Sequence, residues 1–427
     1  MSHAFPPNNV IGAVRVGKFA KYLHQAGHEV RVVAAPVAGD NSLPLEIPRE
    51  RVAYPAGWAS ELVFDNLVKR LRGLAGGPGS GAAPVPAREP TAPGSGGLAA
   101  ALTRHCHALL HIPDHRKGWI AAAAEAGYGF VRDWRPDIIV ASAPPNSGLV
   151  AAARIARRCR APWIAELRDL WTDNPYYAAP GWRFCVDWAI ERRILGSAAG
   201  LVTVTPGWAA TLRRHYRQPV ACILNGYAEE DFPAEPVAPP PGEVVSIVYT
   251  GNIYAGYRDP SALFRAIGLL GAERSRVAVH FYGPDENQVA PLAKLHRVED
   301  RVFVHDRVAY KDSLALQATA DVLLLLQWNN KKDEGNIPAK FFEYLAAGRP
   351  VLMLGYEHGD LAQMVRERRA GSVANDPATI AQQLRRWLGQ RPSGIRAVDR
   401  QARAGMTRAE QFRKYEQFLI ETVTERA

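Results

Sequence analysis

The chain alternates short apolar runs with helical segments, and it does so twice, on either side of a proline-rich stretch. The apolar runs are 27–36, 135–145, 161–169 and 200–207 before that stretch, and 244–252, 276–284, 301–308, 320–328 and 349–355 after it. Strands that alternate with helices predict a parallel, doubly wound sheet, because parallel strands need a crossover connection. The fold class predicted is therefore α/β, with two Rossmann-like sheets.

A length of 427 residues fits two domains of roughly 200 residues each. The sequence predicts an N-terminal domain over 1–232, a linker over 233–243 and a second domain over 244–400. A last helix over 401–427 is expected to return to the first domain. Two such domains are expected to face each other across a cleft.

Two segments depart from this regular arrangement. Residues 73–99 are rich in glycine, alanine and proline, so we expect a disordered insertion, and deletion of 76–97 is expected to leave the fold and donor binding intact. The chain opens with MSHAFPP, where a doubly wound fold places an apolar strand. Most of that strand is therefore expected to be missing from this numbering.

Composition limits the functional classes. Hydrophobic residues make up 47% and charged residues 22%, which is typical of a globular protein. Neither a membrane-spanning run nor a signal peptide is evident, and the four cysteines form no C-x-x-C pair, so a reducing cytoplasm is expected. The net charge of +10 favours an acidic partner. Without an RRM, helix-turn-helix or finger signature, nucleic acid is not an expected partner.

The segment EGNIPAKFFEYLAAGRPVL, residues 334–352, predicts a helix over 338–347. Pro338 suits the first turn, Asn336 can cap it, and Gly348 can end it. The amino end of such a helix attracts a diphosphate, because it offers unpaired backbone N–H groups and is the positive end of the helix dipole.

Lys340 and Glu343 lie three residues apart on one face of this predicted helix. Lys340 can add a positive charge to a diphosphate site, and Glu343, expected to be exposed, can bind a ribose diol. The alternative is an ordinary surface pair of lysine and glutamate on an amphipathic helix.

A second group of polar residues ends the predicted strand 161–169. Glu166, Arg168 and Asp169 lie at the carboxyl edge of a parallel sheet, where such folds bind ligands, so we expect catalytic groups on the acceptor side. The alternative is that Arg168 and Asp169 only form a salt bridge. Residues 7–12 form a loop in which Gly12 can let the backbone approach the donor phosphates.

Several weak motifs occur in one order and together resemble glycosyltransferase family 4. They are FPPNNVIGAVRVGKFAKYLHQAGHEVRVV, IPDHRKGWIAAA, APPNSGLVAAARIA, AELRDLWTDNPYY, VTPGWAATLRRHY, ILNGYAEEDF, IVYTGNIYAGYRDP and the 334–352 segment. The resemblance implies a GT-B fold in which Glu343, the second glutamate of an E-x7-E motif, binds the donor ribose. Asn336, Ile337 and Pro338 then belong to the donor-binding segment.

The sequence departs from the family pattern at two places. The first glutamate of the motif is expected at 335, which is glycine, and Glu334 lies one residue earlier. The Gly-Arg pair and the lysine after it that many members carry are replaced by Gly251-Asn252, with Arg258 the nearest cation. Arg258 and Lys340 are thus the candidates for contacting the diphosphate.

The resemblance implies a retaining hexosyltransferase-type enzyme that transfers a sugar from a nucleotide diphosphate, with UDP expected, to a glycan or lipid-linked acceptor of surface polysaccharide synthesis. No cofactor or metal is expected, and the sequence contains no D-x-D motif. Two other functions stay open: a nucleotide-sugar 2-epimerase, which needs no acceptor, and an inactive binding subunit.

Three further patterns lie outside these motifs. Histidines at 105, 107, 111 and 115 resemble metal ligands, but Pro113 interrupts the helix, so polar residues of a partly exposed helix and loop are favoured. Residues 58–72 form an amphipathic pattern that suits either the core or the cytoplasmic face of a membrane. Residues 154–160 are expected to be a solvated helix face.

Overall fold

The computed structural model describes residues 1–37, 39, 41–58, 105–232 and 237–425. The predicted insertion 73–99, most of the amphipathic segment 58–72 and the first four residues of the predicted linker lie outside the described residues. Contacts within the chain define two compact units. Unit 1 comprises Met1–Val204, Ala209–Cys222 and Tyr415–Ala427, and unit 2 comprises Thr205–Trp208 and Ile223–Lys414.

Unit 1 contains a parallel four-stranded sheet in the order β3-β4-β5-β6 and a parallel pair β1-β2. The strands are β1 Val32–Val33, β2 Val52–Ala53, β3 Ile139–Ala143, β4 Trp163–Leu167, β5 Gly200–Thr203 and β6 Val220–Cys222. The first residues of the chain join the two sheets: the Ser2 amide donates to the Val33 carbonyl at 3.1 Å, and Ser2 forms a parallel bridge with Ser142. MSHAFPP thus occupies the place where a strand was expected.

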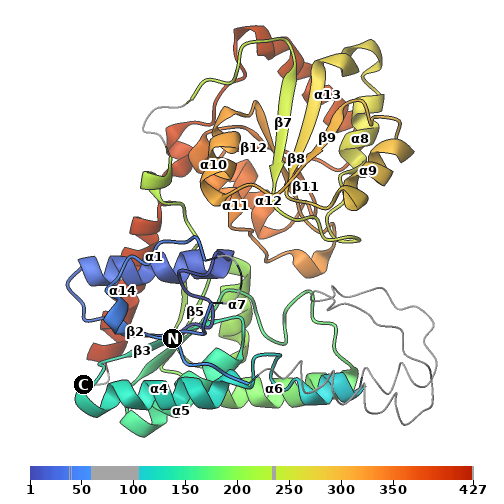
Figure 1. Cartoon of the computed structure of the whole chain (residues 1–427). Coiled ribbons are helices and arrows are strands. Elements are labelled where there is room, and N and C mark those ends of the chain that lie inside the picture. The colour runs from blue at the N-terminus through green and yellow to red at the C-terminus, as the bar shows by residue number, and fades with distance from the viewer. Residues whose placement is uncertain (38, 40, 59–104, 233–236, 426–427) are drawn as a thin grey trace. The chain divides into compact units, whose positions relative to one another are not determined.

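The helices that begin within unit 1 follow the predicted alternation (Figure 1). They are α1 Ile11–Gln25, α4 Trp119–Asp133, α5 Ser147–Cys159 and α6 Gly181–Leu195, and α7 Pro206–His215 and α14 Arg408–Thr424 contribute most of their residues. Gly27 follows α1 with φ +92°, a conformation that glycine adopts without a steric cost. Arg154, Arg157 and Arg158 of α5 are exposed, which confirms the predicted solvated face.

Unit 2 contains a parallel six-stranded sheet in the order β12-β11-β10-β7-β8-β9. Its strands are β7 Val245–Thr250, β8 Val277–Tyr282, β9 Val302–His305, β10 Val322–Leu326, β11 Val351–Leu354 and β12 Gly371–Val373. All residues of β10 are buried, as expected for a strand covered by helices on both faces. Side chains of α8 Ser261–Gly268, α9 Glu286–Leu295 and α13 Pro377–Gln390 pack in one core on this sheet.

The opposite face of this sheet carries α11 Lys340–Ala347 and α12 Asp360–Glu367, with α10 Tyr310–Thr319 beside them (Figure 1). The doubly wound α/β prediction is therefore confirmed. The strands that the sequence did not predict, β2, β6 and β12, have two or three residues each, too few to show a period.

Candidate functional site

The candidate donor residues of unit 2 meet where β7 ends. The Lys340 ammonium donates to the Thr250 carbonyl at 2.6 Å and lies 4.0 Å from the centre of the Tyr249 ring. Gly251 follows with φ +105°, and a Cβ there would lie only 3.0 Å from Lys340 Nζ. Glycine therefore both permits this turn and leaves room beside the lysine. Since β7 is parallel to its neighbours, this is the sheet edge at which such folds bind ligands.

The charge on Lys340 is incompletely offset by protein groups. Burial lowers the pKa of its ammonium, and the positive charge of Arg258 lowers it further. A bound anion would favour the charged form again, because an opposite charge stabilises an ammonium in a low-dielectric site. These electrostatics suit the binding of a diphosphate.

Glu343 is buried, with 6% of its surface exposed, so the expectation of an exposed helical glutamate is wrong. Its carboxylate accepts from the Tyr310 hydroxyl at 3.2 Å and from Gln317 Nε2 at 3.3 Å. Gln317 also donates to the Thr250 hydroxyl at 3.1 Å. Lys340 and Glu343 thus have separate tertiary partners, which contradicts the alternative of a surface pair. The reason is that α10 packs against α11 and covers the glutamate.

Arg258 and Asn252 lie together in the loop after β7. Arg258 Nη1 donates to the Asn252 carbonyl at 2.9 Å, and the guanidinium lies over the Tyr254 ring. Arg307 Nη2 donates to Asn252 Oδ1 at 3.2 Å. The loop after β9 therefore adds a cation that was not predicted from the sequence, because 55 residues separate Arg307 from Asn252.

The residues before α11 differ from the predicted cap. The helix begins at Lys340, its N-cap is Ala339, and no side chain caps it, so the capping role predicted for Asn336 is wrong. Asn336 Nδ2 instead donates to Asp333 Oδ1 at 3.1 Å, and the Asn336 carbonyl accepts from Gln327 Nε2 at 2.8 Å. This hydrogen bonding holds the loop between β10 and α11.

The other predicted residues of this loop contribute differently. Ile337 is 2% exposed and packs in the core that also contains α11, so its backbone rather than its side chain is available to a ligand. Pro338 accepts from the Phe341 amide at 3.0 Å and starts the first turn. Glu334 has an exposed side chain, and its carbonyl accepts from the Asp360 amide at 2.7 Å. The carboxylate of Glu334 therefore stays accessible.

In unit 1, Glu166 of β4 forms a buried ion pair. Glu166 Oε1 lies 2.9 Å from Arg15 Nη2, and the two side chains are 4% and 6% exposed. The Nε of Arg15 donates to the same oxygen at 3.0 Å. This pair ties α1 to β4, so Glu166 contributes to positioning α1.

Arg168 lies at the carboxyl end of β4 and contacts two elements. Its Nε donates to the Ala143 carbonyl at 3.2 Å and its Nη2 to the Pro144 carbonyl at 2.6 Å, just beyond β3. A Cβ on Gly12, in the first turn of α1, would overlap the Arg168 guanidinium. Gly12 therefore provides space for Arg168, whereas its place in the sequence predicted that it would let the backbone approach the donor phosphates. Asp169, the next residue, is exposed.

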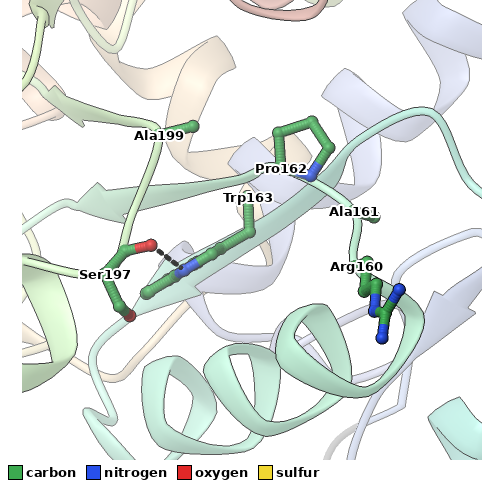
Figure 2. Close-up of a pocket in the computed structure, with 6 residues that line it drawn as sticks. All are labelled: Arg160, Ala161, Pro162, Trp163, Ser197 and Ala199. Atoms are coloured by element: carbon green, nitrogen blue, oxygen red, sulfur yellow. Dashed lines mark hydrogen bonds between the residues drawn. The ribbon is translucent and has the colours of Figure 1, made fainter. Parts of the chain in front are cut away.

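A pocket of about 450 Å³ also occurs in unit 1, lined by residues 160–163 with Ser197 and Ala199 (Figure 2). Trp163 Nε1 donates to the Ser197 carbonyl at 3.0 Å across it. Trp163 is the first residue of β4, so this pocket lies at the amino edge of the sheet. Ligands of doubly wound folds bind at the opposite, carboxyl edge, so the pocket is not a candidate for the transfer site.

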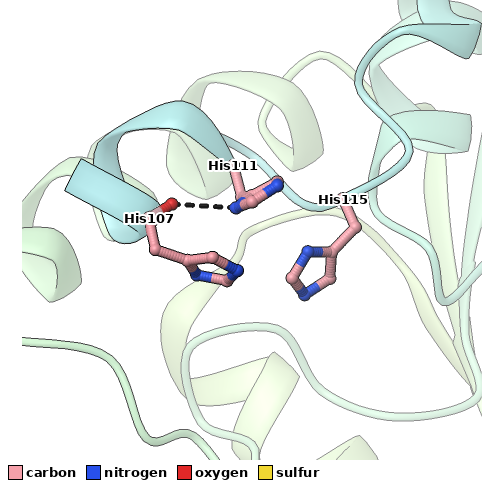
Figure 3. A group of neighbouring side chains, drawn as sticks. All are labelled: His107, His111 and His115. Atoms are coloured by element: carbon pink, nitrogen blue, oxygen red, sulfur yellow. Dashed lines mark hydrogen bonds between the residues drawn. The ribbon is translucent and has the colours of Figure 1, made fainter. Parts of the chain in front are cut away.

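The histidine segment is more compact than the sequence indicated. Pro113 does follow the helical residues 105–110, yet the chain turns back and places His115 beside His107 and His111 (Figure 3). Burial lowers the pKa of His111 to about 4, and the neighbouring His107 and His115 contribute to the shift. His111 is therefore neutral at pH 7.

Helix α6 has an unusual distribution of residues. Arg183, Asp187 and Glu191, four residues apart, are 2–5% exposed, whereas Trp182 and Trp188 are 37% and 44% exposed. This helix presents aromatic rings to the outside and three of its charged residues to the protein, the reverse of the usual arrangement. The guanidinium of Arg192 lies 4.9 Å from the Trp188 ring centre.

Sequence patterns missed the residues that support the candidate site. Tyr310 and Gln317 donate to Glu343, Gln317 also donates to Thr250, and Arg15 holds Glu166. A polar residue within the apolar stripe of a helix is the signal that could have identified Gln317 and Arg15. Their partners could not be assigned, because those come from other elements.

Comparisons with known proteins agree with this fold. Residues 12–228 match the family model of the glycosyl transferase 4-like domain, and residues 245–390 match that of glycosyl transferases group 1. No match was found among curated protein sequences.

Solved structures with a similar fold include a glycosyltransferase from Rickettsia africae, with a TM-score of 0.59, 14% identity, and coverage of 99% of this chain and 98% of that one. Sucrose-phosphate synthase from Thermosynechococcus elongatus has a TM-score of 0.61 and 14% identity, covering 97% and 94%. WaaG, a glycosyltransferase involved in lipopolysaccharide biosynthesis, has a TM-score of 0.53 and 15% identity, covering 98% and 94%. These likenesses show the GT-B architecture.

Proposed function

This chain belongs to the glycosyl transferase 4-like family and is a glycosyltransferase, and on that premise we propose that it uses a UDP-sugar as donor. The acceptor proposed is a glycan or lipid-linked glycan of surface polysaccharide synthesis, which fits the likeness to WaaG. The observation that carries the donor assignment is the convergence of Lys340, Gly251 and Glu343 around the end of β7.

Each of these groups suits one part of a nucleotide diphosphate. Lys340 and Arg258 can offset the charges of the two phosphates, and Gly251 leaves space for a phosphate beside the lysine. Glu343 can accept hydrogen bonds from the ribose hydroxyls, and Tyr310 and Gln317 fix the orientation of its carboxylate. Arg307 holds Asn252 and so orders the loop that carries Arg258.

The proposed transfer retains the anomeric configuration and needs no metal ion. The bond between the anomeric carbon and the β-phosphate oxygen breaks, and the acceptor oxygen bonds to that carbon from the same face. The acceptor proton passes to the departing phosphate. Fixed cations such as Lys340 and Arg258 stabilise the charge that develops on the leaving group, which is the role a metal has in other transferases.

Unit 1 supplies the acceptor side in this proposal. Arg168 donates to the carbonyls of Ala143 and Pro144 at the end of β3 and lies in the space beside Gly12. The exposed Asp169 follows it at the same sheet edge. A guanidinium and a carboxylate at this edge suit the orientation of a polar hydroxyl acceptor.

A lipid-linked acceptor implies contact with a membrane surface, and α6 supports that part of the proposal. Its exposed Trp182, Phe184 and Trp188 and the nearby Arg192 and Arg193 suit the interface of an anionic membrane. No helix within the described residues is long and apolar enough to cross a membrane. Co-sedimentation with vesicles of anionic lipid tests this, and double substitution of Trp182 and Trp188 by serine should reduce binding.

The donor assignment is tested by a thermal-shift series with UDP, GDP and ADP and their sugars, because a ligand that binds the native state raises the Tm. UDP compounds should raise the Tm most. A larger shift with GDP would show that the donor carries guanosine rather than uridine. Product analysis with and without acceptor follows. Release of free UDP and an altered sugar without acceptor would indicate epimerisation rather than transfer.

A further inference from the structure

Three imidazoles of unit 1 converge on one point. The ring centres of His107 and His111 are 4.1 Å apart, those of His111 and His115 are 4.4 Å apart, and those of His107 and His115 are 5.4 Å apart. One ring nitrogen from each residue lies within 4.8 Å of the others (Figure 3). In a tetrahedral zinc site, nitrogens about 2 Å from the ion stand roughly 3.3 Å apart, so small side-chain rotations would bring these three into range.

The tautomer of His111 is fixed by its hydrogen bond. His111 Nδ1 lies 2.9 Å from the His107 carbonyl oxygen, and because a carbonyl can only accept, Nδ1 carries the proton. The lone pair is therefore on Nε2. In metal-binding histidines, the N–H group of the second ring nitrogen characteristically donates a hydrogen bond to a carbonyl or carboxylate in this way. That hydrogen bond sets the orientation of the ring.

The backbone that carries the three rings is fastened independently of any ion. The buried Arg183 of α6 donates to the carbonyls of Ala108, His111 and Pro113, with distances of 2.8 Å to His111 and 3.0 Å to Pro113. Its Nε pairs with Asp187 at 2.7 Å. One guanidinium thus holds the segment before and after the turn, so the positions of His107 and His111 are set in advance.

The loop that carries the third ring is fastened on the other side of the turn. Asp114 accepts from the Ser147 amide at 2.7 Å, from the Ser147 hydroxyl at 2.6 Å and from the Arg116 amide at 2.7 Å. This fastens the loop that contains His115 to the start of α5.

From this geometry we propose that His107, His111 and His115 bind one divalent transition-metal ion of the zinc type. Three imidazole nitrogens suit zinc and do not suit magnesium or calcium, which prefer oxygen ligands. The ion links the helical residues 105–110 to the loop that leads into α4 and so stabilises unit 1. It takes no part in the sugar transfer proposed above.

The test uses the full chain after dialysis against a chelator. Calorimetric titration with zinc chloride should show one ion bound per chain, and cobalt(II) added in its place should produce the visible absorption of a nitrogen-ligated ion. Magnesium chloride should produce no comparable binding. Zinc should also raise the Tm of the parent protein.

Substitutions identify the ligands. His107→Gln and His115→Gln should each weaken zinc binding at least tenfold, and His115 is exposed, so that variant keeps the apo fold. His105→Gln is the matched control, since His105 lies in the same helical stretch but stacks on Trp182. His305→Gln is a second control, because His305 also lies close to another histidine, His280. Parent protein that binds no zinc at micromolar concentration, or ligand variants that bind like the parent, would overturn the proposal.

Discussion

Glu343 lies in an environment that its place in the sequence did not predict. It lies on the helix where the family pattern places a ribose ligand, yet Tyr310 and Gln317 enclose its carboxylate. A buried carboxylate with two donors is both oriented for a ligand and important for packing.

We predict that Glu343→Gln weakens binding of the donor nucleotide about ten- to a hundredfold, because losing a charge-assisted hydrogen bond costs about 1.5–3 kcal/mol. Glu343→Ala should weaken it similarly and also lower the Tm of the free protein, since it leaves Tyr310 and Gln317 with a missing partner. Calorimetry and thermal denaturation measure the two effects. Glu286→Gln, on the exposed first turn of α9, is the control. If both Glu343 variants bind the nucleotide with unchanged affinity, this residue is not part of the donor site.

Arg168 is the corresponding candidate on the proposed acceptor side. We predict that Arg168→Ala lowers kcat about a hundredfold while the Kd for the nucleotide changes little, because removal of one positioned donor typically costs this much. Asp169→Ala should act in the same direction. Arg157→Ala, an exposed arginine of α5, should leave both quantities unchanged. Collapse of nucleotide affinity with normal turnover at saturation would contradict the assignment.

At the scale of elements, the packing of α1 on the end of β4 determines where Arg168 can lie. A Cβ on Gly12 would displace the guanidinium, so we predict that Gly12→Ala reduces kcat in the same way as Arg168→Ala. In the Arg168→Ala background, Gly12→Ala should have little further effect, because the overlapping group is gone. Independent, multiplicative losses in the double variant would show that Gly12 acts by another route.

The same two elements are joined by the ion pair of Arg15 and Glu166. Because both side chains are buried, removing one partner leaves an uncompensated charge. We predict that Glu166→Ala lowers the free energy of unfolding by about 3–5 kcal/mol. The double variant Arg15→Met, Glu166→Met should lose less than Glu166→Ala alone. Urea denaturation provides the values, and a larger loss in the double variant would be inconsistent with this account.

For the whole molecule, the donor proposal predicts where nucleotide binding slows exchange of backbone hydrogens. Binding of UDP to the full chain should protect residues 250–258 and 336–343, because these loops carry the groups assigned to the diphosphate and ribose. Mass spectrometry of the exchanged peptides measures this protection. Peptides from α13 serve as the reference, since this helix packs on the opposite face of the sheet. Protection confined to other segments would relocate the donor site.

The sequence by itself determined the fold class, most strands, the principal helices and the family. These follow from periodicity and short motifs, which depend on neighbouring residues along the chain. Gly251, Lys340 and Glu343 were predicted as donor-site residues in this way, and Asn336 was predicted to cap a helix, which it does not do in the structure.

Only the tertiary structure decided which distant groups surround these residues. It brought Gln317 and Tyr310 to Glu343, Arg307 to Asn252, Arg168 to Gly12 and His115 back to His107. Such contacts depend on how helices pack on a sheet and how a chain turns after a proline. A local sequence pattern does not depend on that packing, so the burial and the tertiary partners of these residues could not be derived from it.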